Sequence, residues 1–207
     1  MNEYKFTNNW FNSTAESSWD LLIPQIKPRT ILEIGSYEGA SACYLIDKLS
    51  TDSDIEIHCI DTWEGGIDQK DLEIDMESVE KRFDQNIHLS KSNARNKITI
   101  LKHKNYSYFC LSKLICEKKN NYFDFIYIDG SHQAPDVLCD AVLAFRLLKI
   151  GGHMVFDDYL WSEKLPYGTD PIRCPKPAID AFININIRKL RILSAPLYQI
   201  YVQKISD

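Results

Sequence analysis

Five short apolar runs, separated by longer segments with helical periodicity, constrain the fold of this chain more than any other feature. The runs are residues 30–34, 55–60, 98–101, 123–128 and 153–156. Between the last two runs, apolar residues recur at the spacing of one helix face: Val137, Ala141, Ala144, Phe145 and Leu148. Residues 76–87 show the same spacing. Strands that alternate with helices predict an α/β fold with a doubly wound, mostly parallel sheet.

Three segments depart from this alternation. Residues 62–92 form a long polar insert after the second strand, predicted to be a loop followed by the 76–87 helix. Residues 161–177 contain four prolines and a glycine, which predicts an ordered surface loop. A loop of this length in a compact domain is usually functional, so we expect it at the active site. Residues 188–204 are predicted to be a terminal pair of strands broken near 194–196.

Length and composition narrow the class of protein. The 207 residues predict a single domain over 1–207. The net charge of −5 leaves no basic excess for nucleic acid, and no apolar run approaches the ~20 residues that span a bilayer. The N-terminal segment has no signal-peptide pattern, which predicts a cytoplasmic protein. Six cysteines without a CxxC pair predict reduced, mostly packed thiols rather than a disulfide framework.

In an open parallel sheet, ligands bind beyond the carboxyl ends of the strands, so the residues after the first two runs are candidates. Gly35 allows a tight turn, and Gly39 allows a close approach of ligand and backbone at a helix start. Asp61, after the second run, is placed to accept hydrogen bonds from ribose hydroxyls, and Trp63 to stack on a base. The alternatives are a plain strand-to-helix turn, a solvated strand-end carboxylate and a packed aromatic residue. The dinucleotide fingerprint G-x-G-x-x-G is absent, because Tyr37 occupies the place of its second glycine.

Acidic residues follow the fourth and fifth runs. Asp129 ends one run, and Asp157 and Asp158 end the next. If these strands are neighbours, the three carboxylates repel one another unless a hard divalent cation such as Mg²⁺ binds them. His132, three residues after Asp129, is a candidate general base. The alternative is that the acidic residues end a strand and cap a helix while His132 lies on the surface.

These motifs, taken in order, resemble those of the class I S-adenosylmethionine-dependent methyltransferases. The resemblance covers about residues 28–160 and is strongest to the macrocin-type small-molecule O-methyltransferases, which methylate sugar hydroxyls with a divalent metal. It is carried by Glu33-Ile-Gly-Ser-x-x-Gly39, Asp61, Asp129-Gly-Ser-His132 and the segment 148–158. The resemblance implies a seven-stranded sheet whose C-terminal strand is antiparallel.

The resemblance also implies roles for individual residues. Those expected to line the methionine side of the cofactor are Glu33, Gly35, Ser36 and Gly39. Asp61 would hold the ribose, and Ser107 would lie near the adenine. Asp129 would lie beside the cofactor and would also bind the metal together with Asp157 and Asp158, with His132 as the base.

The function expected from the sequence is S-adenosylmethionine-dependent, metal-assisted O-methylation of a small hydroxylated acceptor, with a sugar as one candidate. The expected cofactors are S-adenosylmethionine and a divalent metal, Mg²⁺ in the first place. The expected partner is a small-molecule acceptor, without nucleic acid or membrane, and a homo-oligomer is left open. Two alternatives remain: a catalytically silent nucleoside-binding module of the same fold and a nicotinamide-dependent oxidoreductase.

Overall fold

The computed structural model describes residues 3–67, 74–163 and 165–207, which fall into two compact units. Unit 1 comprises residues 1–106 and unit 2 residues 107–207. Residues 68–73 of the predicted insert 62–92 and residue 164 of the predicted loop 161–177 lie outside the described residues. The expectation of a single domain over 1–207 stays a prediction.

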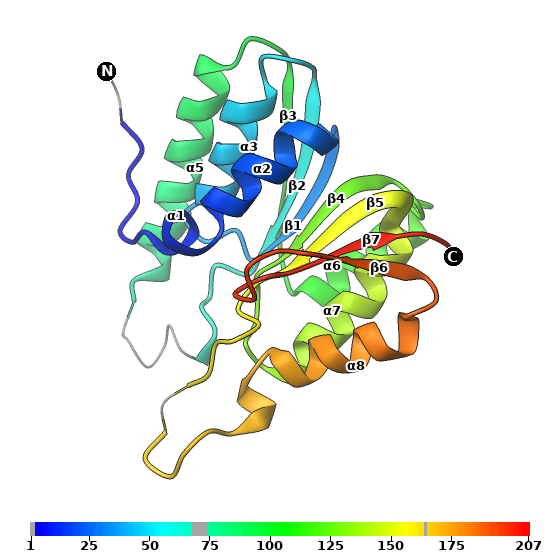
Figure 1. The fold of residues 1–207 in the computed structure, drawn as a ribbon. Coiled ribbons are helices and arrows are strands. Elements are labelled where there is room, and N and C mark those ends of the chain that lie inside the picture. Colours follow the sequence, from blue (N-terminus) through cyan, green and yellow to red (C-terminus); the bar gives the residue numbers. More distant parts are fainter. Residues whose placement is uncertain (1–2, 68–73, 164) are drawn as a thin grey trace. The chain divides into compact units, whose positions relative to one another are not determined.

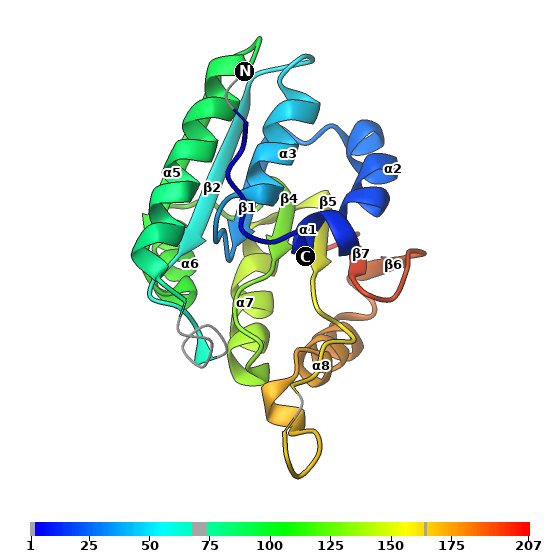
Figure 2. The same cartoon turned by 90° about the vertical axis from the view of Figure 1, so that its left-hand side faces the viewer.

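Unit 1 contains three parallel strands in the order β3-β2-β1, which are β1 (Thr30–Ile34), β2 (Ile55–Asp61) and β3 (Ile98–Lys104). Its helices are α1 (Trp10–Thr14), α2 (Glu16–Ile26), α3 (Ala40–Leu49) and α5 (Met76–Asn93). Helix α3 packs on β2, and α5, α3 and α2 lie side by side (Figure 2). The three runs predicted as strands in this unit are confirmed.

The predicted 76–87 helix is confirmed as the first part of α5. Asp75 caps this helix, because its carboxylate accepts a hydrogen bond from the Ser78 backbone N–H at 3.3 Å. Val79, Phe83 and Ile87 are buried one turn apart, as the periodicity predicted.

Unit 2 contains four strands in the order β4-β5-β7-β6 (Figure 1). They are β4 (Phe123–Ile128), β5 (Leu148–Phe156), β6 (Leu190–Leu193) and β7 (Ile200–Lys204). β4 and β5 are parallel, whereas β7 runs antiparallel to both β5 and β6. The predicted terminal pair of strands is therefore confirmed, and its second strand is the one that joins the sheet at β5.

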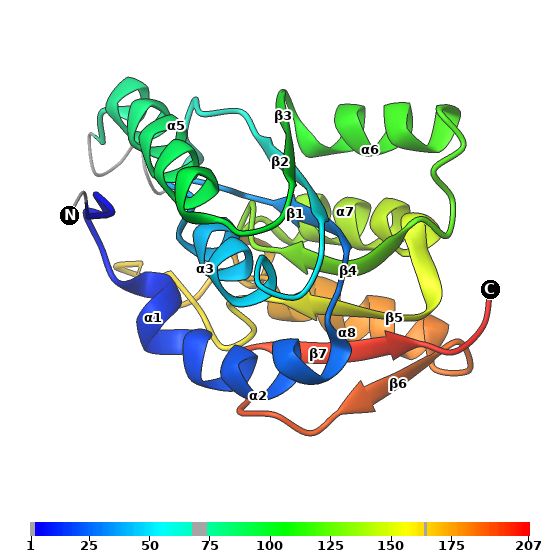
Figure 3. The ribbon, with the colours of Figure 1, turned by 90° about the horizontal axis from the view of Figure 1, so that it is seen from above.

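Helices α6 (Ser107–Cys116), α7 (Ala134–Leu147) and α8 (Lys176–Asn186) form a row in unit 2 (Figure 3). α7, at the centre of the row, packs on β4 and β5. The predicted helix face is buried, but Leu148 is the first residue of β5 and not part of the helix. The loop before α8 contains the 3-10 helix η1 (Pro171–Arg173), and Arg173 pairs with Glu163 at 2.6 Å, which agrees with an ordered surface loop.

All six cysteines are free thiols, and four of them are buried. No helix among the described residues is long and apolar enough to cross a membrane.

Candidate functional site

The turn after β1, residues 35–39, has a backbone that favours glycine at both ends. Gly35 has φ 87° and Gly39 has φ 82°, in the left-handed region that most side chains avoid. Gly39 also lies against α5, because a Cβ there would come within 3.0 Å of the Phe83 ring. The contact with Phe83 is therefore sufficient to explain why position 39 is a glycine. The close approach of a ligand at this residue stays a prediction.

Asp61, at the end of β2, fixes the shape of this turn. One carboxylate oxygen accepts hydrogen bonds from the backbone N–H groups of Ser36 at 3.0 Å and Tyr37 at 2.9 Å. The other oxygen accepts the Trp63 N–H at 2.7 Å. Burial raises the pKa of this carboxyl group, while the N–H donors act in the opposite direction. The structure thus shows a positioning role for Asp61, and its predicted ribose contact stays a prediction.

Glu33 lies beneath the turn and is completely buried. Its carboxylate accepts hydrogen bonds from the hydroxyl groups of Ser36, at 2.5 Å, and Ser41. Burial raises the pKa of Glu33. The predicted cofactor residues Glu33 and Ser36 are therefore hydrogen-bonded to each other inside unit 1.

Trp63 is packed rather than presented at a surface. Its side chain is 3% exposed, its ring centroid lies 4.9 Å from that of Phe83, and its indole N–H donates to the Tyr37 carbonyl at 2.9 Å. This is the packed arrangement that the sequence left open, and stacking on a base stays a prediction.

Sequence reasoning missed the part that Glu38 plays at the turn. The buried Glu38 carboxylate accepts hydrogen bonds from the Thr7 backbone N–H at 2.7 Å and from the Thr7 hydroxyl at 2.8 Å. It also pairs with Arg82 at 2.5 Å. The N-terminal segment and α5 are thereby tied to the turn, through partners 31 and 44 residues away in sequence.

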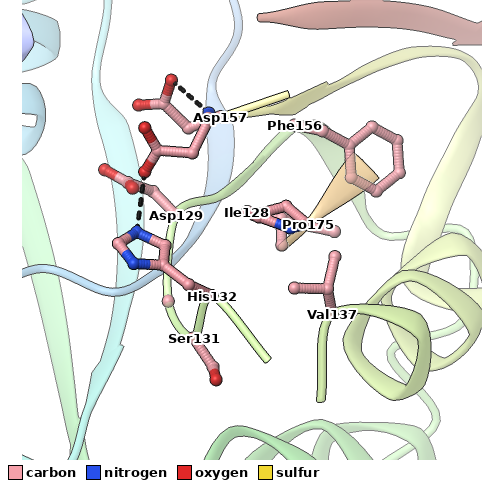
Figure 4. Close-up of a pocket in the computed structure, with 10 residues that line it drawn as sticks. Ile128, Asp129, Ser131, His132, Val137, Phe156, Asp157 and Pro175 are labelled. Carbon is pink, nitrogen blue, oxygen red and sulfur yellow. Dashed lines mark hydrogen bonds and ion pairs between the residues drawn. The ribbon is translucent and has the colours of Figure 1, made fainter. Parts of the chain in front are cut away.

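Unit 2 contains a pocket at the carboxyl ends of β4 and β5, with an empty volume of about 230 Å³ that is partly open to solvent. Its apolar lining is formed by Ile128, Val137, Phe156 and Pro175. We call it the acidic pocket, because its polar lining includes Asp129, His132, Asp157 and Asp158. Figure 4 shows the Asp129 and Asp157 carboxylates and the His132 ring on the same side of it. The predicted adjacency of the two strands is confirmed by the pairing of Ile128 with Phe156.

His132 and Asp158 form a pair in the acidic pocket. The His132 Nε2 atom lies 2.9 Å from an Asp158 carboxylate oxygen, and both side chains are less than one-fifth exposed. The His132 ring packs on Trp161, with centroids 3.9 Å apart. Asp158 adopts a left-handed φ of 55°, a conformation that aspartate tolerates better than most residues. A histidine oriented by a carboxylate in this way is suited to act as a general base.

Asp157 belongs to a buried hydrogen-bond chain that the sequence did not reveal. Its carboxylate accepts hydrogen bonds from the Tyr127 hydroxyl and, at 2.8 Å, from the Asp158 backbone N–H. The Gln199 amide lies 3.4 Å from the Tyr127 hydroxyl, and Tyr201 donates to Gln199. Burial and the neighbouring Asp158 charge raise the pKa of Asp157 to about 6.

The three predicted metal ligands therefore line one pocket, but they do not form a preorganised metal centre. Within the part of the chain that the structure describes, no three His, Cys, Asp or Glu side chains are grouped so as to hold a metal ion. Their oxygen donors suit Mg²⁺ chemically, although two of the carboxylates are bonded to protein donors. Metal binding stays a prediction.

Ser107, predicted near the adenine, is the first residue of α6. Its side chain hydrogen-bonds to Asp140 on α7, which is 2% exposed. Among the described residues, the Oδ1 atom of Asp140 has no hydrogen-bond partner, and burial raises the pKa of this carboxyl group to about 7. The observed role of Ser107 is thus to contact α7, and the adenine contact stays a prediction.

A family described as a methyltransferase domain matches residues 32–159, which is more than half of the chain. The chain therefore belongs to this methyltransferase family, and the resemblance stated from the sequence is confirmed. A protein of Acanthamoeba polyphaga mimivirus is 29% identical over 142 residues, covering 66% of this chain and 55% of that protein. The chain thus spans about half the length of this curated relative.

Two solved structures show the same fold. The O-methyltransferase of Bacillus cereus, in complex with SAH, has a TM-score of 0.62 at 18% identity, over 98% of this chain and 84% of its own. The O-methyltransferase TomG of Streptomyces achromogenes, in complex with SAM, has a TM-score of 0.61 at 16% identity, over 90% of this chain and 77% of its own. The predicted fold class is confirmed: α/β, with seven strands, mostly parallel, and antiparallel strands at the C-terminus.

Proposed function

We propose that this protein is an S-adenosylmethionine-dependent O-methyltransferase that acts on a small hydroxylated acceptor, with sugar hydroxyls among the candidates. The observation that carries the proposal is the His132–Asp158 pair in the acidic pocket of a chain from the methyltransferase family. The family match argues against the nicotinamide-dependent alternative. A cytoplasmic location remains part of the proposal.

In the proposed mechanism His132 removes the proton of the acceptor hydroxyl. An alcohol is almost un-ionised at neutral pH, so its oxygen needs a base as it attacks a methyl group. When the neutral ring donates its Nε2–H to Asp158, Nδ1 is its basic atom. Asp158 then orients the ring and stabilises the imidazolium that forms.

Candidate contacts to the cofactor are assigned separately in each unit. S-Adenosylmethionine supplies an electrophilic methyl group on a positively charged sulfur. We assign its methionine part to Glu33, Gly35, Ser36 and Gly39. Asp61 and Trp63 are assigned to the ribose and the base, Ser107 to the adenine, and Asp129 to the neighbourhood of the cofactor. The left-handed Gly35 and the Asp61 carboxylate that fixes the turn support this assignment.

We also propose that a divalent cation, Mg²⁺ in the first place, is held by Asp129, Asp157 and Asp158. Such a cation lowers the pKa of a hydroxyl group that it binds. Three carboxylates that line one pocket support a site with excess negative charge. Methyl transfer should then stop with a chelator and return with Mg²⁺, and transfer that is indifferent to chelator would remove the metal from the mechanism.

The test is transfer of a labelled methyl group from S-adenosylmethionine to a panel of small hydroxylated acceptors. We expect His132→Gln to lower kcat by at least ~100-fold through loss of the base, with binding of S-adenosylhomocysteine unchanged. The matched control is His88→Gln, because His88 is exposed on α5. Equal kcat for His132→Gln and wild type would contradict the mechanism, and cofactor binding without transfer to any acceptor would favour the silent module.

A further inference from the structure

Residues 185–192, which we call the basic edge, lead from the end of α8 to the outer strand of unit 2. Three isoleucines in this segment are exposed: Ile185 by 74%, Ile187 by 55% and Ile192 by 50%. β6 pairs with β7 on one side and is the last strand in the described sheet order. These isoleucines lie within eight residues of sequence, and β6 is the outer strand of the sheet among the described residues. Exposed apolar side chains beside a strand edge are typical of an interaction surface.

The basic edge is also positively charged in a chain that is acidic overall. Arg188, Lys189 and Arg191 are exposed, and no Asp or Glu occurs from residue 181 to residue 206. The nearest acidic residue on the C-terminal side is Asp207, whose pKa the charge of Lys189 helps to lower. The ion pairs found among the described residues include none of these three side chains. In a chain of net charge −5, this local excess is available to an anionic partner.

The combination of positive charge and exposed apolar side chains distinguishes between three classes of partner: a second copy of the chain, a nucleic acid and a membrane surface. A second copy docked edge to edge would place two cationic segments against each other, which like-charge repulsion opposes. A nucleic acid would use the basic residues but would leave the isoleucines without an apolar environment. The surface of an anionic bilayer satisfies both kinds of side chain.

We propose that the basic edge docks on anionic phospholipid. Arg188, Lys189 and Arg191 bind the headgroup phosphates, and Ile187 and Ile192 enter the boundary between headgroups and acyl chains. This surface binding needs no spanning helix, and it goes beyond the proposed methyl transfer. The sequence-based expectation of no membrane partner stays a prediction, and the vesicle experiment below decides between it and this proposal.

The test is cosedimentation of the full chain with vesicles of phosphatidylcholine, with or without phosphatidylserine. We expect binding only with phosphatidylserine, and loss of that binding in high salt. The Arg188→Glu/Arg191→Glu variant should bind at least ~10-fold more weakly. Ile187→Ser/Ile192→Ser should also weaken binding while leaving its salt dependence in place. The charge-matched control is Arg95→Glu/Lys97→Glu, which reverses two exposed basic residues in unit 1.

Three results would overturn the proposal. They are no sedimentation of wild type with either vesicle, equal binding to both vesicles, and equal loss of binding in the Arg95→Glu/Lys97→Glu control. A dimer of wild type in sedimentation velocity that Arg188→Glu/Arg191→Glu abolishes, without vesicle binding, would identify a second copy as the partner instead. Thermal unfolding confirms that each variant is folded, and S-adenosylhomocysteine binding tests the proposed function separately.

Discussion

Buried carboxyl groups are the most informative single residues in this protein. Burial raises the pKa of Glu33, Asp61, Asp140 and Asp157. Three of them have several hydrogen-bond donors around them, which offset part of the cost of burial. Asp140 differs, because one of its oxygens has no partner among the described residues.

This difference predicts a pH-dependent stability that Asp140→Asn removes. The pKa of Asp140 rises from an ordinary 3.8 to about 7 on folding, so the folded state favours the protonated acid. Protonated Asp140 therefore contributes fully to the free energy of unfolding below pH ~4. This contribution is lost as the pH rises to about 7, a change of up to about 4 kcal/mol. Urea denaturation should show a smaller loss of unfolding free energy between pH 4 and 8 in the variant. Parallel pH profiles for variant and wild type would show that Asp140 does not titrate as described.

A second prediction concerns Tyr127, the centre of the hydrogen-bond chain to Asp157. Tyr127→Phe removes the hydroxyl group that donates a hydrogen bond to Asp157 and accepts one from Gln199. Each of these two side chains then loses a hydrogen bond. We expect the unfolding free energy to fall by about 1–3 kcal/mol, measured by urea denaturation at pH 8. The matched control is Tyr159→Phe, whose hydroxyl bonds to the partly exposed Asp180 at 2.7 Å and should cost less than about 1 kcal/mol. An equal loss of unfolding free energy in both variants would mean that the buried hydrogen bonds of Tyr127 stabilise the fold no more than the hydrogen bond of Tyr159.

At the scale of elements, the five apolar runs were sufficient to predict β1 to β5, because every run lies in the sheet and all but the run at 98–101 are mostly buried. The start of β5 was predicted five residues too late, since Lys149, Ile150 and Gly151 are not apolar core positions. Sequence position also identified the acidic pocket, because parallel strands end at one edge of a sheet. The partners of these residues were not predictable, since Tyr127 and Gln199 lie 72 residues apart and meet only through strand pairing.

The junction of the turn and α3 yields a third prediction. Gly39→Ala forces a left-handed φ on a side chain and brings its Cβ to 3.0 Å from the Phe83 ring. We expect a loss of about 1–3 kcal/mol in unfolding free energy. The control is Gly151→Ala, with φ 87° and nothing within 4 Å of the added Cβ, which isolates the cost of the backbone conformation. If Gly39→Ala costs no more than Gly151→Ala, the contact with Phe83 contributes nothing.

At the scale of the whole molecule, each of the two units contains candidate functional residues. Unit 1 contains the turn that Asp61 fixes, and unit 2 contains the acidic pocket with its His132–Asp158 pair. The family match runs from residue 32 to residue 159 and therefore includes residues of both units. The proposed reaction therefore depends first on whether the chain binds the cofactor that its family implies.

Titration calorimetry of S-adenosylhomocysteine into the full chain measures this most directly, with NAD as the comparison. We predict one saturable binding event per chain for S-adenosylhomocysteine and no heat of binding for NAD. Binding of NAD, or the absence of any heat with S-adenosylhomocysteine at ligand concentrations well above those typical for small-molecule cofactors, would contradict the assignment.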